Sequence, residues 1–181
     1  RAPADDAGAR GGEAMTIRPE TVADHAVIRE INVAAFADHP YSHQTEHLIV
    51  EALRGAGALE LSLVAEEGGE VVGHIAFSRA TIGGAECGWY LLGPVAVLPA
   101  LQGRGIGGRL VNAGLHELRR RGARGCALVG EPAYYERFGF RSDPGLTYPG
   151  VPAEYLLCLP LVGGVPGGEV RHHPAFDAGA E

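Results

Sequence analysis

The sequence contains no lysine, because all 15 of its basic residues are arginine. The absence of lysine excludes any Schiff-base or pyridoxal chemistry built on a lysine side chain. It also excludes the lysine of a P-loop nucleotide site. No apolar run is long enough to cross a membrane as a helix. The net charge of −7 argues against general binding to nucleic acid or to a membrane surface.

Cysteine is scarce as well, and its spacing indicates neither a metal site nor a disulfide framework. Cys87, Cys126 and Cys158 are far apart in the chain and form no CxxC pair. Such cysteines most often serve as small buried side chains in a reducing compartment. We therefore expect a cytoplasmic protein without a bound metal.

Glycine is abundant, and its most informative cluster lies at residues 103–108. The apolar residues before this cluster predict a strand, and those from Ile106 onward recur at helical spacing. A glycine loop between a strand and a helix N-terminus forms an anion site, most often for phosphate. No acidic residue between Leu91 and His116 would repel a phosphate. The alternative is a glycine-rich turn that binds nothing.

Two specific interpretations fit this loop. Residues 103–108 match the GxGxxG dinucleotide fingerprint, and Glu131 follows at a plausible distance. Gln102, Gly105 and Gly107 match the Gln/Arg-x-x-Gly-x-Gly/Ala pyrophosphate loop of acyl-CoA-dependent N-acyltransferases. The order of the surrounding elements distinguishes the two.

The hydrophobic pattern and the turn residues predict the elements along the chain. The expected strands are Thr16–Arg18, Leu61–Glu66, Val71–Ser78, Gly88–Val97, Gly125–Val129 and Glu154–Leu159, with Phe140-Arg141 extended, and the expected helices begin at Thr21, Gln44, Ile106 and Pro132. A dinucleotide fold places its glycine loop after the first strand, whereas here three strands in succession precede it. We therefore expect an α/β fold with a mixed, mostly antiparallel, twisted central sheet of six to seven strands and about four flanking helices.

The same pattern divides the chain into three parts. Residues 1–14 are small, polar and glycine-rich, which indicates a disordered extension or an expression artefact before Met15. Residues 15–162 form the expected domain, and residues 163–181 are punctuated by glycine and proline and are expected to be irregular.

Two segments of the chain resemble the GNAT superfamily of N-acetyltransferases. Residues 93–107 are similar to its cofactor loop, and Tyr135, Gly139 and Phe140 fill its Tyr-x-x-x-Gly-Phe signature. The resemblance is firm over about residues 88–141 and consistent from 16 to 159. Gly130 departs from it, since many members carry Asn there. The tail at 172–176 resembles a bacterial branch of predicted acetyltransferases.

The resemblance implies acetyl transfer from acetyl-CoA to a primary amine of an unidentified acceptor, by direct attack. It implies that Gly93-Pro94 forms a bulge, that pantetheine pairs with the strand edge beyond it, and that the Val97 N–H polarises the thioester carbonyl. The positions it assigns to the cofactor are Val95, Ala96, Val97, Gln102, Gly103, Arg104, Gly105, Ile106, Gly107, Gly108 and Arg109. A homodimer is compatible with this interpretation.

Three residues are candidates for proton transfer. Tyr135 is the candidate general acid for the leaving thiolate, and its alternative is a core tyrosine. Glu86, expected just before the fourth strand, is one candidate base. His74, in the middle of a strand, is the other, although a hydrogen-bonded structural histidine is the commoner outcome. Tyr134 is expected to serve in packing.

Histidines gather between the first two expected helices. His43, Glu46 and His47 match the HxxEH pattern of some zinc hydrolases, with two histidines on one helix face. No third ligand stands out downstream. In the resembled fold this loop borders the acceptor, so His39, Tyr41 and His43 are either substrate-binding residues or a solvated turn. A non-catalytic acyl-CoA-binding sensor is the remaining alternative.

Overall fold

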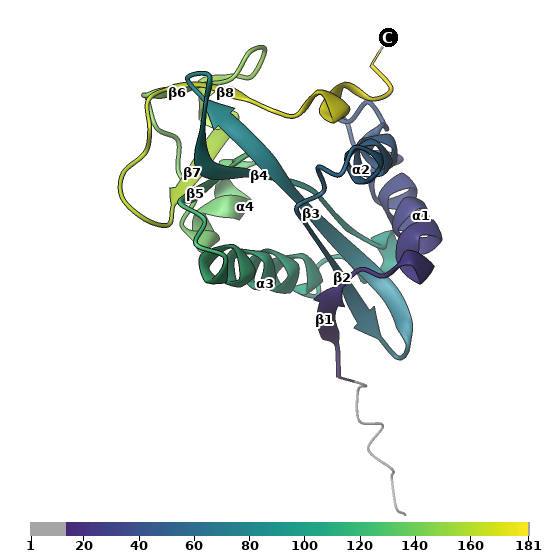
Figure 1. The fold of residues 1–181 in the computed structure, drawn as a ribbon. Coiled ribbons are helices and arrows are strands. Elements are labelled where there is room, and N and C mark those ends of the chain that lie inside the picture. The colour runs from purple at the N-terminus through teal and green to yellow at the C-terminus, as the bar shows by residue number, and fades with distance from the viewer. Residues whose placement is uncertain (1–13, 181) are drawn as a thin grey trace, which may run out of the picture.

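The computed structural model describes residues 14–180 as a twisted sheet with helices on both faces (Figure 1). α3 (Ile106–Arg120) covers one face, and α1 (His25–Phe36) and α2 (Glu46–Gly55) cover the other. The expected extension at residues 1–14 lies outside the described residues, apart from Ala14. No helix in the described part of the chain is long and apolar enough to span a membrane.

The sheet has eight strands, one more than the upper limit expected from the sequence. The main path runs β1 (Thr16–Pro19), β2 (Leu61–Glu67), β3 (Glu70–Ile82), β4 (Ala85–Val97), β5 (Gly125–Val129) and β7 (Leu156–Pro160). Along this path only β4 and β5 are parallel. The predicted mixed, mostly antiparallel sheet is therefore confirmed, and so are four α-helices, the fourth being α4 (Pro132–Tyr135).

The two faces of β3 separate two parts of the core. Ile75 and Phe77 pack under α3 in the larger apolar cluster, whereas Ala76 packs with Ile28 of α1 and Val50 of α2. This alternation follows from the two-residue period of a strand. The 3₁₀ turn at Val22–Asp24, which leads into α1, is capped, because the Thr21 N–H donates to the Asp24 carboxylate at 2.7 Å.

The β3–β4 hairpin is longer than the sequence pattern indicated. β3 continues to Ile82 and β4 begins at Ala85, and the two meet at Gly83-Gly84, where both residues have positive φ (63° and 81°). The prediction that β4 begins at Gly88 is wrong, because these two glycines make a tight turn that the apolar pattern did not reveal. Glu86 consequently lies within β4.

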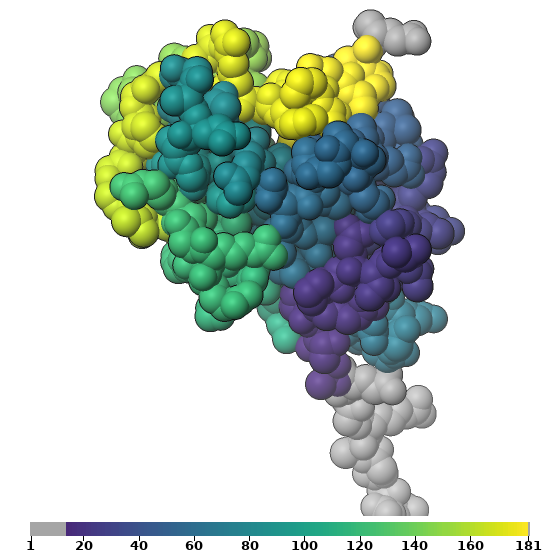
Figure 2. All heavy atoms as spheres, viewed as in Figure 1, coloured from purple at the N-terminus to yellow at the C-terminus, as the bar shows by residue number. Residues whose placement is uncertain are grey.

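The tail at residues 163–181 was expected to be irregular, but it contains regular structure. It contains β8 (Gly168–Arg171) and a 3₁₀ turn at Pro174–Asp177. β2 pairs with β3 only as far as Phe77, so the edge of β3 beyond that residue is open, and β8 pairs there with Thr81 and Ile82. β6 (Leu146–Thr147) then pairs in parallel with β8. The 3₁₀ turn packs against α2, and Figure 2 shows the yellow tail lying on the blue helix.

Candidate functional site

The centre of the site is the point where β4 leaves β5. The two strands pair only at Trp89–Leu91 and Gly125–Ala127. Just beyond, the β3–β4 register shifts, because Ile75 lies opposite Val95 and Phe77 lies opposite Leu92. Gly93 and Pro94 of β4 therefore lie opposite a single residue of β3, which makes a bulge. The bulge expected at Gly93-Pro94 is therefore present, and it coincides with the separation of β4 from β5.

Past the bulge, β4 presents a free edge. The Leu98 N–H donates to the Val72 carbonyl at 3.0 Å, which fixes the alternation of the β3–β4 ladder. By that alternation Val95 and Val97 direct their N–H and C=O groups away from β3, whereas Ala96 directs its own toward it. Among the described residues no strand pairs with this edge. It can accept an extended ligand in the manner of an added strand.

The glycine loop lies directly after this edge. Gly103 (φ 78°) and Gly105 (φ 83°) adopt the left-handed conformation, and a Cβ built on either would meet no atom within 4 Å. Gly105 caps α3, whose first backbone bond runs from the Arg109 N–H to the Gly105 carbonyl at 3.1 Å. The N–H groups of residues 106–108 thus lack helical acceptors and are available to an anion.

Side chains tie the loop to its surroundings. Gln102 Nε2 donates to the Val97 carbonyl at 3.1 Å, so the loop is fastened to the end of β4. Arg104 pairs with Glu67 at 3.4 Å on the surface, and Arg109 donates to the Met15 carbonyl at 3.0 Å. Gln102 therefore orders the loop through its side chain, while the two arginines leave positive charge beside it.

Tyr134 and Tyr135 lie in α4, and their rings point in different directions. A Cβ built on Gly107 would lie 3.2 Å from Tyr134 Oη, so this hydroxyl lies over the first turn of α3. The Tyr134 ring also stacks under the Arg137 guanidinium, 4.6 Å from the ring centroid. Gly107 thus makes room for Tyr134. Packing is the role that the sequence suggested for this residue.

Tyr135 turns inward toward the separation of β4 and β5. Its ring packs edge-on against Tyr134 (4.9 Å between centroids) and Phe140 (6.1 Å). Burial raises the pKa of Tyr135 to about 12, with smaller contributions from the neighbouring Tyr134 and Cys126. The Cys126 thiol in turn lies against the backbone of Leu92, the first β4 residue beyond the paired segment. The phenol is therefore protonated at neutral pH and lies close to the bulge.

The position of the Tyr135 ring explains why residue 130 is a glycine. A Cβ built at this position would lie 2.5 Å from Tyr135 Cε2, which no real contact allows. Many GNAT members carry Asn at this position. Here the inward-facing Tyr135 ring occupies the space that an Asn side chain would need. The Gly130 N–H still donates to the Tyr155 carbonyl at 3.0 Å, which holds the end of β5 in place.

The position of His74 argues against its role as a base. Its side chain is 0 % exposed, on the α1 side of the sheet. Asn32 Nδ2 donates to its Nδ1 at 3.2 Å, and Ser62 Oγ lies 2.8 Å from its Nε2. Burial, with a smaller effect of the Arg54 charge, lowers the pKa of His74 to about 3. Both ring nitrogens are engaged and the ring is closed to substrate, so His74 is a structural residue.

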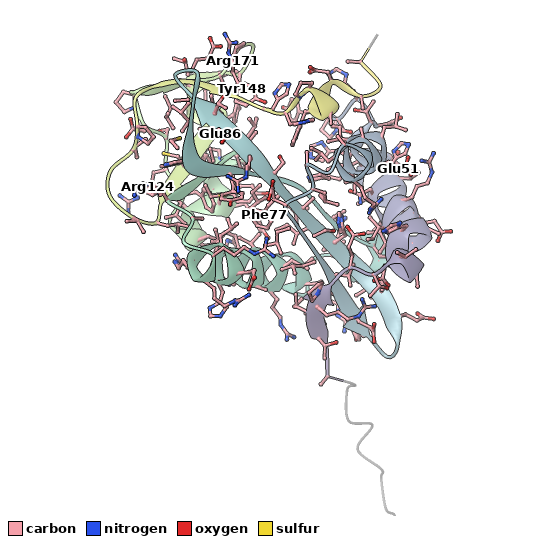
Figure 3. All side chains as sticks on the ribbon, in the orientation of Figure 1. Glu51, Phe77, Glu86, Arg124, Tyr148 and Arg171 are labelled. Atoms are coloured by element: carbon pink, nitrogen blue, oxygen red, sulfur yellow. The ribbon has the colours of Figure 1, made fainter. Side chains whose placement is uncertain are left out.

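Glu86 is also displaced from the chemistry. It is exposed in the part of β4 nearest the Gly83-Gly84 turn, opposite Thr81 (Figure 3). Two register shifts absorb residues of β4, so the β3 partners of Glu86 and Val95, Thr81 and Ile75, are only six residues apart. At about 3.3 Å per residue this separates Glu86 from Val95 by roughly 20 Å. Contact with an amine at the bulge is out of its reach. Glu86 was expected just before β4, close to the acceptor, because the predicted start of β4 was too late in the sequence.

The histidine-rich loop between α1 and α2 is open to solvent. His39 and His43 are exposed, Tyr41 is 88 % exposed, and the rings of His39 and Tyr41 are 6.3 Å apart. Glu46 is hydrogen-bonded to the Ser42 hydroxyl. Within residues 14–180 no group of three His, Cys, Asp or Glu side chains could hold a metal ion. The zinc-hydrolase alternative therefore gains no third ligand from the fold.

The sequence did not point to two cavities that the fold creates. One of about 470 Å³ lies between α3 and the β1–β2 edge, away from the glycine loop. The other, of about 350 Å³, lies beside β8 and is lined in part by Tyr148 and His172. No local motif marks Tyr148, and the paired histidines at 172–173 were the only signal in the tail.

Comparisons with known proteins agree with this geometry. Residues 58–142 match the acetyltransferase (GNAT) domain family. The chain is 38 % identical over 143 residues to the uncharacterized N-acetyltransferase YjhQ of Escherichia coli, covering 75 % of this chain and 76 % of that protein. A β4–β5 separation beside a glycine loop, on this sheet, defines an acyltransferase. The chain belongs to the GNAT family of N-acetyltransferases.

Two solved structures are similar over nearly the whole chain. A GNAT family acetyltransferase from Brucella melitensis, solved with acetyl-CoA, is 53 % identical with a TM-score of 0.83, and covers 91 % of this chain and 99 % of its own. E. coli YhbS, solved with CoA, is 28 % identical with a TM-score of 0.81, covering 96 % of this chain and 97 % of its own.

Proposed function

We propose that this N-acetyltransferase takes its acetyl group from acetyl-CoA and transfers it to a primary amine by direct attack. The observation that carries the proposal is the adjacency of two sites: an anion site at the N-terminus of α3 and a free strand edge at Val95–Val97. A ligand made of a pyrophosphate joined to an extended amide chain would use both, with the pyrophosphate in the anion site and the amide chain along the strand edge. Acetyl-CoA supplies the activated acetyl group as a thioester.

The loop binds the phosphate end of the co-substrate. The N–H groups of Ile106, Gly107 and Gly108 bind phosphate oxygens, and the positive end of the helix dipole adds to the attraction. Arg104 and Arg109 contribute charge-assisted bonds. The Arg104–Glu67 pair is exposed and 3.4 Å long, so it is weak and can be exchanged for a phosphate contact.

The free edge positions the thioester. Val95 and Val97 offer backbone groups to the amide-bearing arm, and the Val97 N–H faces the thioester carbonyl as an oxyanion donor. Because Gln102 holds the Val97 carbonyl, this part of the strand is fixed before the ligand binds. The edge therefore requires little reorganisation in the transition state.

Tyr135 completes the transfer as general acid. The amine nitrogen forms its bond to the acetyl carbon while the carbon–sulfur bond breaks, and the sulfur takes a proton from the Tyr135 hydroxyl. The amine loses one proton to a base. The raised pKa of Tyr135 keeps the phenol protonated over the working pH range.

The acceptor is an amine of unidentified structure, and the exposed loop at His39, Tyr41 and His43 borders its approach. The net charge of −7 favours a cationic or small acceptor over nucleic acid or a membrane surface. Three free cysteines, two of them buried, favour the reducing cytoplasm. A homodimer stays a prediction, to be measured by light scattering.

Thermal unfolding tests the proposal at low cost. Saturating acetyl-CoA should stabilise the protein by about 2–4 kcal/mol, whereas NADH and zinc should not. A shift with NADH and none with acetyl-CoA would contradict the proposal. An amine panel with thiol detection then separates the enzyme from an acyl-CoA-binding sensor, which would bind the co-substrate without turnover.

A further inference from the structure

The C-terminal tail runs from the edge of the sheet to the start of α2. β8 pairs with the open edge of β3, and the chain after it crosses to α2 (Figure 2). A Cβ built on Gly179 would lie 2.8 Å from both Leu48 Cδ1 and Thr45 Cγ2, so the tail backbone lies directly against them. Thr45 immediately precedes α2. The tail therefore contacts the last residue of the α1–α2 loop (residues 37–45).

A chain of hydrogen bonds and stacked rings holds this part of the tail. The Tyr148 hydroxyl bonds to His172 Nδ1, and His172 Nε2 lies 3.0 Å from Asp177 Oδ1. The His172 ring stacks on Tyr148, with 5.6 Å between centroids, and its centroid lies 5.4 Å from that of Phe176. These contacts fix the path of the 3₁₀ turn at Pro174–Asp177, which packs against α2.

The loop that the tail contacts has a strained backbone. Within residues 14–180, Gln44 is the only non-glycine residue with positive φ (60°). Its side chain donates to the Ala37 carbonyl, and its N–H donates to Ser42 Oγ at 2.8 Å. Such a conformation persists where the surrounding contacts determine it, and it is found most often where a ligand is held. Gln44 directly precedes Thr45, so the tail supports the strained end of the loop.

The other end of the loop lies on the side of the sheet where β4 has its free edge. Ile28, near the start of α1, packs with Val64 of β2. One turn later Asn32 donates to His74 of β3, which lies opposite Ala96 of β4. α1 contacts both β3 and β4, so it crosses the sheet toward β4 as it approaches its C-terminal end. The loop begins at that end, on the face opposite α3.

We propose that residues 172–179 form a strap that holds the α1–α2 loop in the conformation that binds a small primary amine as the acetyl acceptor. The inference rests on the acetyl transfer proposed above. Tyr148, His172 and Asp177 are positioning residues, because they act on the acceptor through the strap and the loop. The apparent affinity of a ligand falls with the fraction of protein in the binding conformation. Release of the strap should therefore weaken acceptor binding.

The co-substrate half of the site is supported independently of the strap. Gln102 fastens the glycine loop to the Val97 carbonyl at 3.1 Å, and α3 packs on the opposite face of the sheet. The strap contacts α2 and Tyr148 instead. Release of the strap should therefore leave the affinity for CoA unchanged, which distinguishes it from a general loss of folding.

The test uses two variants of the full chain that release the strap at different points. Asp177→Ala removes the hydrogen-bond acceptor of His172, and Gly179→Val places a bulky side chain against α2. Glu169→Ala is the control for the first, because it removes another tail carboxylate, one paired with an exposed arginine. Gly163→Val is the control for the second, because Gly163 has a similar φ (75°) and its Cβ would come no closer than 3.4 Å to a group beyond its chain neighbours.

Three measurements are made on the same samples. Amide hydrogen exchange at residues 37–48 should become about tenfold faster in the two strap variants and stay at the wild-type rate in the controls. Calorimetry should give the same CoA affinity in all five proteins. With saturating acetyl-CoA and benzylamine, tyramine or cadaverine as the probe amine, the strap variants should show a KM raised about tenfold and a kcat that is nearly unchanged.

The outcomes separate this inference from the proposed function. Failure of the wild type to bind acetyl-CoA contradicts the function itself, whereas exchange at residues 37–48 decides the strap without any ligand. Unchanged exchange in both strap variants overturns the strap. Faster exchange with wild-type amine kinetics, or with a loss of CoA affinity, overturns its role in acceptor binding. A wild type that binds acetyl-CoA but acetylates none of the three amines overturns the assignment of a small primary amine to this loop.

Discussion

The co-substrate half of the site and the tail region of the molecule are built in opposite ways. The co-substrate half comes from one continuous segment, residues 91–110, in which strand, bulge, glycine loop and helix follow one another. The tail region instead brings together Tyr148, His172 and Asp177, from a loop and from the tail, through a chain of hydrogen bonds. The first depends on local backbone geometry, the second on the docking of a tail onto β3 and α2. The predictions below separate these dependencies.

Gly105→Glu should have the largest effect, on the continuous half alone. The new carboxylate would stand at the N-terminus of α3 and repel phosphate, so CoA affinity should fall at least about 100-fold. Gly122→Glu is the matched control, because Gly122 also has positive φ (76°) and open space around its Cβ, at the other end of the helix. Titration calorimetry with CoA, alongside thermal unfolding, measures both.

Both variants carry the same left-handed strain, of about 1–2 kcal/mol, and should lose similar stability. If Gly105→Glu remains folded and binds CoA normally, the pyrophosphate site lies elsewhere. Equal loss of affinity in both variants would indicate a general effect of strain.

Tyr135→Phe should lower kcat roughly 100-fold while the acetyl-CoA dissociation constant changes little. The ring and its packing remain, and only the proton donor is lost. Because the pKa of Tyr135 is about 12, the phenol is protonated below that value, so wild-type activity should not decline through this group below about pH 11. Tyr90→Phe removes another buried hydroxyl and serves as control.

Steady-state kinetics and acetyl-CoA binding measured on the same samples give the answer. An unchanged kcat with a higher KM would make Tyr135 a binding residue. An insoluble variant beside a soluble Tyr90→Phe would favour a role in the core.

His74 should affect stability and its pH dependence without any direct effect on chemistry. Its pKa falls from 6.5 to about 3 on folding, so protonation favours the unfolded chain. Its contribution is fully present above about pH 6.5 and is lost as the pH falls toward 3. The slope is at most about 1.4 kcal/mol per pH unit. Urea unfolding at pH 7.5, 6 and 5 should show this slope in the wild type and a shallower one in His74→Gln.

The same His74→Gln protein should retain acetyl transfer at pH 7.5 if enough of it is folded, because the ring is closed to substrate. A folded His74→Gln variant that has lost activity at pH 7.5, with unchanged stability, would return His74 to the list of candidate bases.

Gln102→Leu should have the smallest effect. It removes the 3.1 Å bond to the Val97 carbonyl and so loosens the link between the two parts of the co-substrate half. We expect CoA affinity to fall a few-fold and stability by about 1 kcal/mol. Calorimetry with CoA measures the first. A loss as large as that of Gly105→Glu would mean that Gln102 contacts the ligand directly.

The sequence by itself determined the co-substrate half and the architecture. Gly93-Pro94 marks a bulge because proline cannot donate to a ladder, and glycines at 103 and 105 mark left-handed turns. These are local constraints, readable from neighbouring residues. The element order then distinguished this fold from a dinucleotide fold. The eight strands differ from expectation at the β3–β4 hairpin, at β6, which was not predicted, at the start of β7 and in the tail.

Tertiary structure alone decided the rest. Whether Tyr135 faced the core or the bulge, and whether His74 met solvent or Asn32, depended on packing between elements distant in sequence. Glu86 was misplaced because a two-glycine turn extended a hairpin. The Tyr148–His172–Asp177 chain exists only because β2 leaves the edge of β3 open beyond Phe77, and the tail pairs there. No pattern within the tail carries that information, since an open strand edge belongs to the sheet as a whole.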